Sequence, residues 1–140
     1  LSKTLEVLET FGVPVIACGQ DDFPAFWSRR SGLPAPLRMD DPAIIARAHR
    51  LRAALDLPGG QLIANPLPPK AEIPLETLMP LIDRAQSDAR AQGITGKALT
   101  PFLLQRIFDL TDGRSLSANI ALVCNNAALA ARIAAAICAT

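Results

Sequence analysis

Apolar positions along the chain switch between helical spacing and short continuous runs. Leu5, Val7 and Leu8 are mixed with glutamates in a helical pattern that Gly12 ends. The apolar run Val13–Ala17 follows directly and has the length of a strand. Pro14 lacks an amide hydrogen, so we expect it at the start of this strand or at a sheet edge.

Residues 21–36 form a predicted loop that holds the densest aromatic cluster, Phe23, Phe26 and Trp27. Long loops with aromatic residues are usually functional or packed against a neighbour, and packing is the favoured interpretation here. Asp40, Asp41 and Pro42 then predict a helix start, with Asp as N-cap and Pro in the first turn. Apolar residues follow at helical spacing: Ile44, Ile45, Ala48, Leu51 and Leu55.

The second half of the chain is mostly helical in pattern. A second short strand is predicted over Gln61–Ala64, and helices over 75–92, 100–112 and 115–139. Pro80 should make the first of these begin near Leu78 or kink there. Thr100 is the expected N-cap of the next, so Thr100→Ala should cost about 1 kcal/mol. The alanine-rich last helix is expected to be buried on more than one side.

Two short strands alternating with about five helices predict an α/β fold that is mostly helical in this chain. Two strands do not make a stable covered sheet, so further strands are expected from outside these 140 residues. Half of the residues are hydrophobic and only 19% are charged, which favours a partner domain or subunit. The chain begins at Leu1 within a predicted helix, and we interpret it as part of a longer protein.

Charge and cysteine content narrow the function classes. A net charge of +1 gives no electrostatic footprint for nucleic acid or an anionic membrane, and no run approaches the roughly 20 apolar residues of a membrane span. His49 is the only histidine, and the three cysteines are far apart, which makes a structural zinc site improbable. The unpaired cysteines indicate reduced thiols in a cytosol-like compartment.

The residues alone predict no catalytic apparatus. Lys3, Lys70 and Lys97 are the only lysines. Solvent exposure is the favoured interpretation for Lys3, Lys70 and His49, whereas Lys97 could be partly shielded, with a structural role favoured over a catalytic one. The pair Asp21–Asp22 could bind a cation, but ordinary loop solvation is favoured.

Asparagines within the apolar last helix are more informative, because Asn has poor helix propensity. Asn119 and Asn126 are seven residues apart and share a helix face, whereas Asn125 lies to one side. A buried amide needs a partner, and it can donate to and accept from a nucleobase edge. Composition alone favours an amide that locks a helix interface.

Four blocks carry a family resemblance: LETFGVPVIACGQDDFPAFWSRRSG (Leu8 to Gly32), LPGGQLIANPLP (Leu57 to Pro68), GITGKALTPFLL (Gly93 to Leu104) and GRSLSANIALVCNNAALAARIA (Gly113 to Ala134). They resemble the pseudouridine-5'-phosphate glycosidases, also called the indigoidine synthase A-like family. The match runs from end to end and covers about the C-terminal half of a family member. Residues 1–140 are therefore expected to be the C-terminal portion of a single domain.

The resemblance implies that the chain is the C-terminal part of an α/β/α layered fold, in a cytoplasmic, manganese-dependent homotrimer. It would reversibly cleave the C–C glycosidic bond of pseudouridine 5'-phosphate, a small nucleotide, into uracil and ribose 5-phosphate. The implied mechanism holds C1 of the opened sugar as a Schiff base on a lysine while a glutamate moves protons. Covalent catalysis by the lysine is what makes breaking this bond feasible.

The resemblance places few functional residues in this chain. The family's lysine lies a few residues before the block that begins at Leu1, and its glutamate and metal-binding aspartate lie further upstream. Lys3 is near but does not match. This chain is therefore expected to hold no catalytic residue and no metal ligand, and to be inactive alone. The family's substrate-contacting asparagine matches Asn119, whose amide is expected to face uracil. The alternative is a non-catalytic helical module for subunit interaction, with the aromatic loop and the last helix as its contact.

Overall fold

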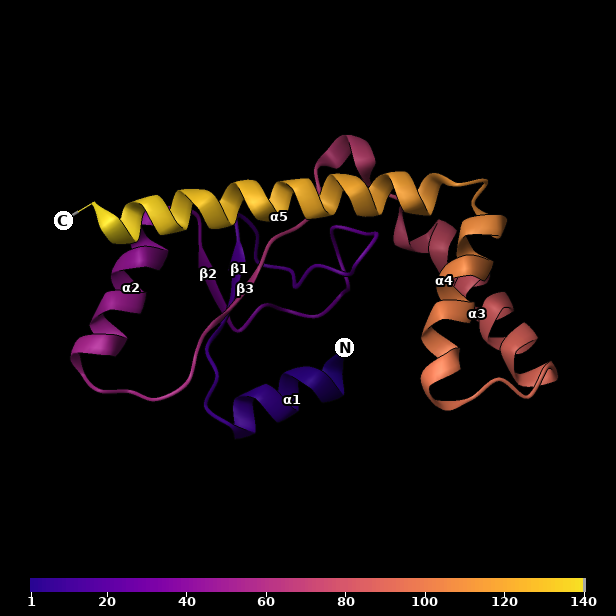
Figure 1. The fold of residues 1–140 in the computed structure, drawn as a ribbon, viewed down its shortest axis with the longest axis horizontal. Helices are drawn as coiled ribbons and strands as arrows, with labels where there is room; N and C mark the ends of the chain where they lie inside the picture. The colour runs from indigo at the N-terminus through magenta and orange to yellow at the C-terminus, as the bar shows by residue number, and fades with distance from the viewer. Residues whose placement is uncertain (140) are drawn as a thin grey trace.

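The computed structural model describes residues 1–139. Within them, five α-helices and one three-stranded sheet confirm the α/β class (Figure 1). The helices are α1 (Ser2–Thr10), α2 (Pro42–Ala54), α3 (Leu75–Ala91), α4 (Leu99–Leu110) and α5 (Arg114–Cys138). The strands are β1 (Val15–Cys18), β2 (Leu37–Met39) and β3 (Leu62–Ala64), and two 3-10 turns cover Pro69–Ala71 and Gly96–Ala98.

The sheet is parallel throughout and has the order β2-β1-β3. Ile16 of β1 pairs with Leu37 on one side and Ile63 on the other. The first three residues of β1 are buried, as expected for a central parallel strand. Pro14 lies just before β1, where its carbonyl accepts a hydrogen bond from the Leu62 amide at 2.9 Å. The predicted place of this proline at the strand start is therefore confirmed.

Residues 1–139 contain three strands, whereas the sequence predicted two, and the additional one is β2. It has only three residues, and both Leu37 and Arg38 are exposed. Three residues are too few to show the alternation of apolar and polar positions that marks a strand. The segment becomes a strand because it pairs with β1. One of the further strands expected from outside the chain is thus supplied from within it.

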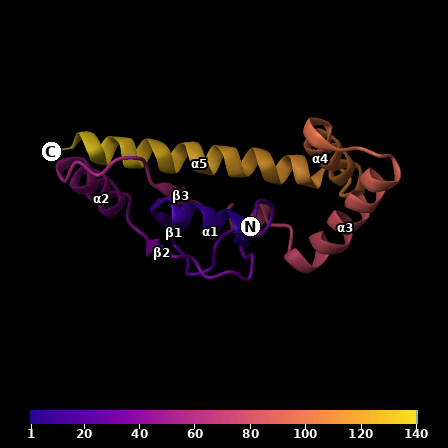
Figure 2. The ribbon, with the colours of Figure 1, turned by 90° about the horizontal axis from the view of Figure 1, so that it is seen from below.

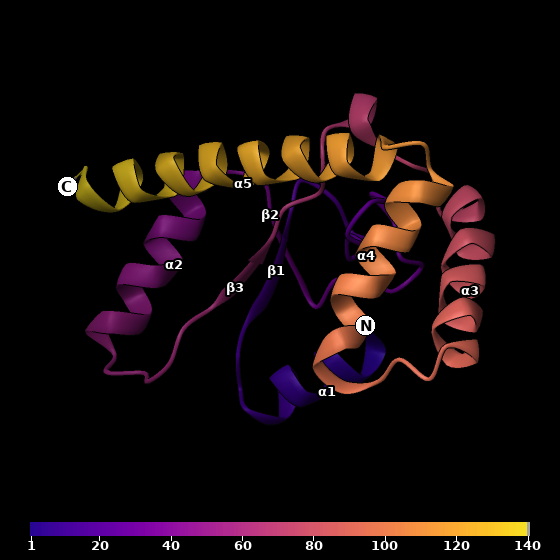
Figure 3. The ribbon, with the colours of Figure 1, turned by 45° about the vertical axis from the view of Figure 1, so that its right-hand side comes forward.

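Helix α5 runs along one side of the molecule and connects its two ends (Figures 1 and 2). Helix α2 packs near its C-terminal end, and α3 and α4 pack against each other near its N-terminal end (Figure 3). The carboxyl end of the sheet meets the middle of α5, because Asn65 directly after β3 donates to Asn126 at 3.2 Å. The main apolar cluster lies beneath the N-terminal half of α5. It contains Trp27, Leu67, Ile73, Leu78, Ala85, Ile107, Ala118 and Leu122.

Helix ends follow the sequence rules in some places and not in others. Asp41 caps α2 as predicted, accepting from the Ala43 amide at 2.8 Å. Thr100 is not an N-cap: α4 begins at Leu99 after a 3-10 turn, and Ala98 precedes it without a side-chain cap. The expected late start of α3 at Leu78 is also wrong, because α3 begins at Leu75 and includes Pro80.

The expectation that α5 is buried on more than one side is wrong within residues 1–139. Its buried residues, Ser115, Ala118, Leu122 and Leu129, form one stripe. On another side Leu116, Ile120 and Val123 are 50%, 57% and 58% exposed. Much of the expected apolar face of α2 is likewise exposed, at Ile44, Leu51 and Leu55.

Helix α5 is also long and apolar enough to cross a membrane by length and composition alone, although the sequence predicted no such span. Core helices of water-soluble proteins pass the same test. In this fold one side of α5 packs against α2, α4 and the turn Pro69–Ala71. One side of α5 is thus covered by this fold, but only 11% of its 18-residue apolar stretch is buried, and a single helix of this kind is weak evidence for a membrane span.

Candidate functional site

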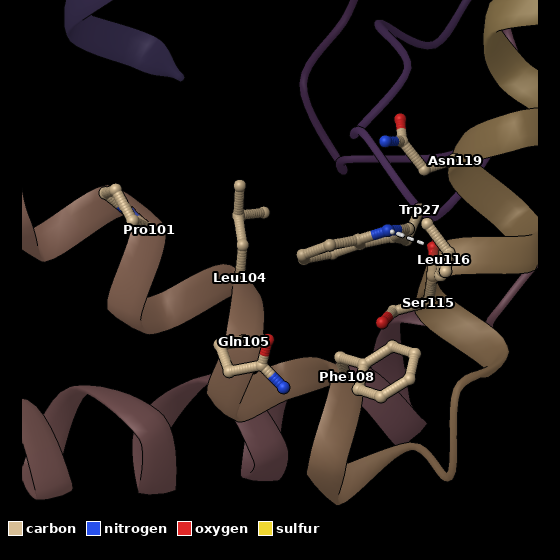
Figure 4. A pocket seen from close by; sticks show the side chains of 8 residues that line it. All are labelled: Trp27, Pro101, Leu104, Gln105, Phe108, Ser115, Leu116 and Asn119. Atoms are coloured by element: carbon tan, nitrogen blue, oxygen red, sulfur yellow. Dashed lines mark hydrogen bonds between the residues drawn. The ribbon is translucent and has the colours of Figure 1, made fainter.

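A cavity of about 400 Å³ lies where α4, α5 and the aromatic loop meet (Figure 4). This volume is within the range of small-molecule pockets. Its walls come from the loop, from α4 and from the first turns of α5. The lining residues are Trp27, Pro101, Leu104, Gln105, Phe108, Ser115, Leu116 and Asn119.

Asn119 is half-buried, and Figure 4 shows its carboxamide directed away from α5 beside the cavity. None of the hydrogen bonds found among residues 1–139 involves this carboxamide, whereas the other two asparagines of α5 are occupied. Asn125 donates to the carbonyl of Pro66 at 2.9 Å, and Asn126 accepts from Asn65. Asn125 and Asn126 therefore fill the helix-locking role, whereas the carboxamide of Asn119 has no such partner within residues 1–139.

The chemistry of this cavity is that of a binding site. None of its eight lining side chains is an acid, a base or a thiol. Aromatic and aliphatic groups offer contact to a flat apolar surface, and the amides of Asn119 and Gln105 offer donors and acceptors. Gln105 is partly engaged, because its amide donates to Asp109 at 3.0 Å. A proton transfer or covalent step here would need groups from outside this set.

A second, polar cluster lies after the ends of β1 and β2. It contains Asp21 and Asp22, the pair considered from the sequence as a possible cation site. Arg38 binds Asp21 at 3.0 Å and Asp40 at 2.8 Å. The hydrogen bond from Arg38 holds the pKa of the exposed Asp40 carboxyl below its ordinary value. Asp22 accepts from the amides of Ser31 and Gly32 at 3.0 and 3.2 Å, so it closes the aromatic loop. Both aspartates of the pair thus have structural partners, which supports the favoured loop interpretation.

The remaining candidate groups are dispersed. Lys3, Lys70 and His49 are exposed, as expected, and Lys97 is also exposed, without the partial shielding considered for it. The three cysteines are free thiols, and burial raises the pKa of the Cys18 thiol. Among residues 1–139, no three His, Cys, Asp or Glu side chains gather in a way that could hold a metal ion.

The family model for indigoidine synthase A-like proteins matches residues 1–136. The chain belongs to the indigoidine synthase A-like family. Proteins named pseudouridine-5'-phosphate glycosidase are similar to it: one from Paracoccus denitrificans is 71% identical and one from Jannaschia is 67% identical, each over 98% of this chain. The chain spans about 45% of the length of these curated relatives.

Solved structures of the family share the fold. The prealnumycin C-glycosynthase, solved with ribulose 5-phosphate, is 29% identical, with a TM-score of 0.88 over 97% of this chain and 45% of that one. An indigoidine synthase A-like protein from Thermotoga maritima is 32% identical, with a TM-score of 0.82 over 94% of this chain and 43% of that one. The α/β arrangement of these 140 residues is therefore a property of the family.

Trp27 and Gln105 line the cavity but were not singled out as ligand contacts from the sequence. The aromatic loop was interpreted mainly as packing, and Trp27 is indeed 9% exposed and part of the main apolar cluster. Its ring also forms a cavity wall, so packing and lining are not exclusive. The presence of tryptophan in a long loop was the available signal, whereas nothing in the sequence distinguishes Gln105 from other glutamines.

Proposed function

We propose that this chain is the C-terminal portion of a pseudouridine-5'-phosphate glycosidase. Such an enzyme converts pseudouridine 5'-phosphate and water into uracil and ribose 5-phosphate, reversibly. The observation that carries the proposal is the 71% identity, over 98% of the chain, to a protein named for this activity. An apolar cavity with a free carboxamide fits the part of the reaction that needs a base-binding wall.

In this proposal Asn119 binds the uracil ring. Uracil presents N–H donors beside carbonyl acceptors, and a carboxamide can pair with such an edge through two hydrogen bonds. Asn119 is suited to this because its neighbours along α5, Asn125 and Asn126, have protein partners and it has none among residues 1–139. Its surroundings are mostly apolar, which strengthens a hydrogen bond by excluding competing water.

The reacting lysine lies outside this chain in the proposed enzyme. In the direction of synthesis its amine would condense with the aldehyde carbon of open-chain ribose 5-phosphate, releasing water and forming an iminium whose carbon accepts an electron pair from uracil as the C–C bond forms. In cleavage the same steps run in reverse: the electrons of the C–C bond leave on the uracil carbon, which takes up a proton, and water hydrolyses the remaining iminium to the aldehyde. Lys3, Lys70 and Lys97 are exposed, and none of them lines the cavity. A glutamate that moves protons would also come from elsewhere, so residues 1–140 alone should not turn over substrate.

Manganese, a homotrimeric assembly and a cytoplasmic location belong to the same proposal. The described residues do not fit a metal site, since no three suitable ligands gather among them. The metal's ligands would therefore lie in the rest of the polypeptide, and no role in metal binding is assigned to this chain.

Replacement of Asn119 by Ala in the complete polypeptide tests the proposal. Loss of the amide should lower kcat/KM for uracil release from pseudouridine 5'-phosphate about 5- to 150-fold, as expected for a hydrogen bond worth about 1–3 kcal/mol. Asn126→Ala is the matched control, because it removes the same group from the same helix two turns further on. It should leave kcat/KM within about twofold.

Two results would contradict the proposal in different ways. A complete wild-type polypeptide that releases no uracil would remove the assigned reaction. An active enzyme in which Asn119→Ala behaves like Asn126→Ala would keep the reaction but remove Asn119 from the base site.

A further inference from the structure

Trp27 is fixed to α5 one turn away from Asn119. Its indole Nε1 donates to the carbonyl of Ser115 at 3.0 Å, although 88 residues separate the two in sequence. Ser115 and Asn119 are four residues apart and therefore lie on neighbouring turns of one helix side. The hydrogen bond thus sets the position of the aromatic ring relative to the carboxamide.

Glu72 and its neighbour Ile73 hold the chain at Trp27 and directly after it. Glu72 Oε1 accepts from the Ser28 hydroxyl at 3.2 Å and from the Arg29 amide at 2.8 Å. The Ile73 amide donates to the carbonyl of Trp27 itself at 2.9 Å. A loop residue would otherwise move, but these contacts anchor Trp27 from its backbone as well as from its ring.

The indole can offer only its face and edge to a ligand. Its single polar atom is already used by Ser115, and Phe26 packs edge-on against the ring with centroids 4.8 Å apart. Figure 4 shows the ring reaching across the cavity toward Leu104 of α4, with Asn119 to one side of it. A flat heterocycle in this space would stack on the indole while its edge meets the carboxamide.

We propose that Trp27 is the stacking wall for the uracil ring and that Glu72 is a positioning residue that holds this wall in place beside Asn119. The inference rests on the proposed function and adds a specificity-determining contact to it. Stacking recognises the base and not the sugar phosphate. Substitutions at Trp27 and Glu72 should therefore weaken the binding of uracil without weakening the binding of ribose 5-phosphate.

The test uses the complete polypeptide in the direction of synthesis, with uracil and ribose 5-phosphate varied separately. Trp27→Leu should raise the KM for uracil about 5- to 150-fold, the range for one stacked base, and leave the KM for ribose 5-phosphate within about twofold. Trp27→Phe keeps an aromatic face but loses the bond to Ser115, so a smaller increase is expected. This variant also keeps the core filled if Trp27→Leu does not fold.

Glu72 is tested through its own pair of variants. Glu72→Ala should raise the KM for uracil, whereas Glu72→Gln keeps an acceptor oxygen for Ser28 and Arg29 and should restore most of the affinity. Adding Glu72→Ala to Trp27→Leu should cause little further change, because Glu72 acts through Trp27. Phe11→Leu and Glu76→Gln are matched controls at exposed positions away from the cavity, and both should match wild type.

The outcomes separate this inference from the proposed function. An inactive wild-type protein would overturn the function on which the inference rests. An active wild type whose Trp27 variants leave the KM for uracil unchanged, or raise both KM values alike, would overturn the stacking role. A Glu72→Ala effect that adds fully to that of Trp27→Leu would overturn the positioning role.

Discussion

Asp41 and Thr100 have the same sequence pattern for a helix N-cap, but only Asp41 is one in the structure. Both precede a proline at a predicted helix start. The Asp41 side chain accepts the Ala43 amide, which has no partner within the helix. Thr100 is already the second residue of α4, so its hydroxyl has no capping position. The local pattern was the same, and the preceding turn Gly96–Ala98 made the difference.

These two positions predict different costs for the same kind of substitution. Asp41→Ala should lower the free energy of unfolding by about 1 kcal/mol. Thr100→Ala should change it by no more than about 0.5 kcal/mol, because no cap is lost. Urea titration of the complete polypeptide measures both. Equal losses from the two substitutions would contradict the helix boundaries described for α4.

At the candidate site, the two main residues differed in how far the sequence could predict them. Asn119, Asn125 and Asn126 were singled out because an amide within an apolar helix needs a partner, and only the family resemblance distinguished Asn119 from the other two. Trp27 could not be placed at the same cavity, because its contact with Ser115 joins positions 88 residues apart. Local patterns contain no information about such a pairing.

Elements with a strong period were predicted with small boundary errors, and elements made by pairing were not. The expected helix over 75–92 became α3, and the expected strand over Gln61–Ala64 became β3. Strand β2 was missed because three residues cannot show a period, and only β1 makes them a strand. Helix α3 also differs from the local expectation, because it begins at Leu75 and continues through Pro80.

Pro80 should be a weak point of α3. It is the sixth residue of the helix, where a proline removes one intrahelical hydrogen bond and crowds the carbonyl four residues earlier. Its side chain is exposed, so an alanine there would lose no buried contact. Pro80→Ala should therefore raise the free energy of unfolding by about 1–3 kcal/mol, measured by urea titration. A loss of stability would mean that the proline is needed for the path of the chain into α3.

At the scale of the whole molecule, the structure has a covered side and an open side of α5. The open side carries Leu116, Ile120 and Val123, each at least half exposed. The chain spans about 45% of its curated relatives, and the low charged fraction had already indicated a missing partner surface. Burial of α5 on more than one side was predicted from its alanine-rich composition. Composition shows that a helix is suited to close packing, but it does not show which segments pack against it.

In the proposed enzyme, the cavity that binds the base and the lysine that reacts with the sugar belong to different parts of the polypeptide. The cavity has a carboxamide and an aromatic wall but no titratable side chain, and the three lysines are exposed elsewhere. In this proposal, residues 1–140 recognise the base, and the amine for the covalent step is brought to the cavity by other parts of the polypeptide.

Mapping the reacting lysine tests this division most directly. The complete polypeptide is incubated with ribose 5-phosphate, the iminium is reduced with borohydride to a stable secondary amine, and the modified peptide is identified by mass spectrometry. The account predicts one modified lysine, located before residue 1 of this chain. An adduct on Lys3, Lys70 or Lys97 would contradict it.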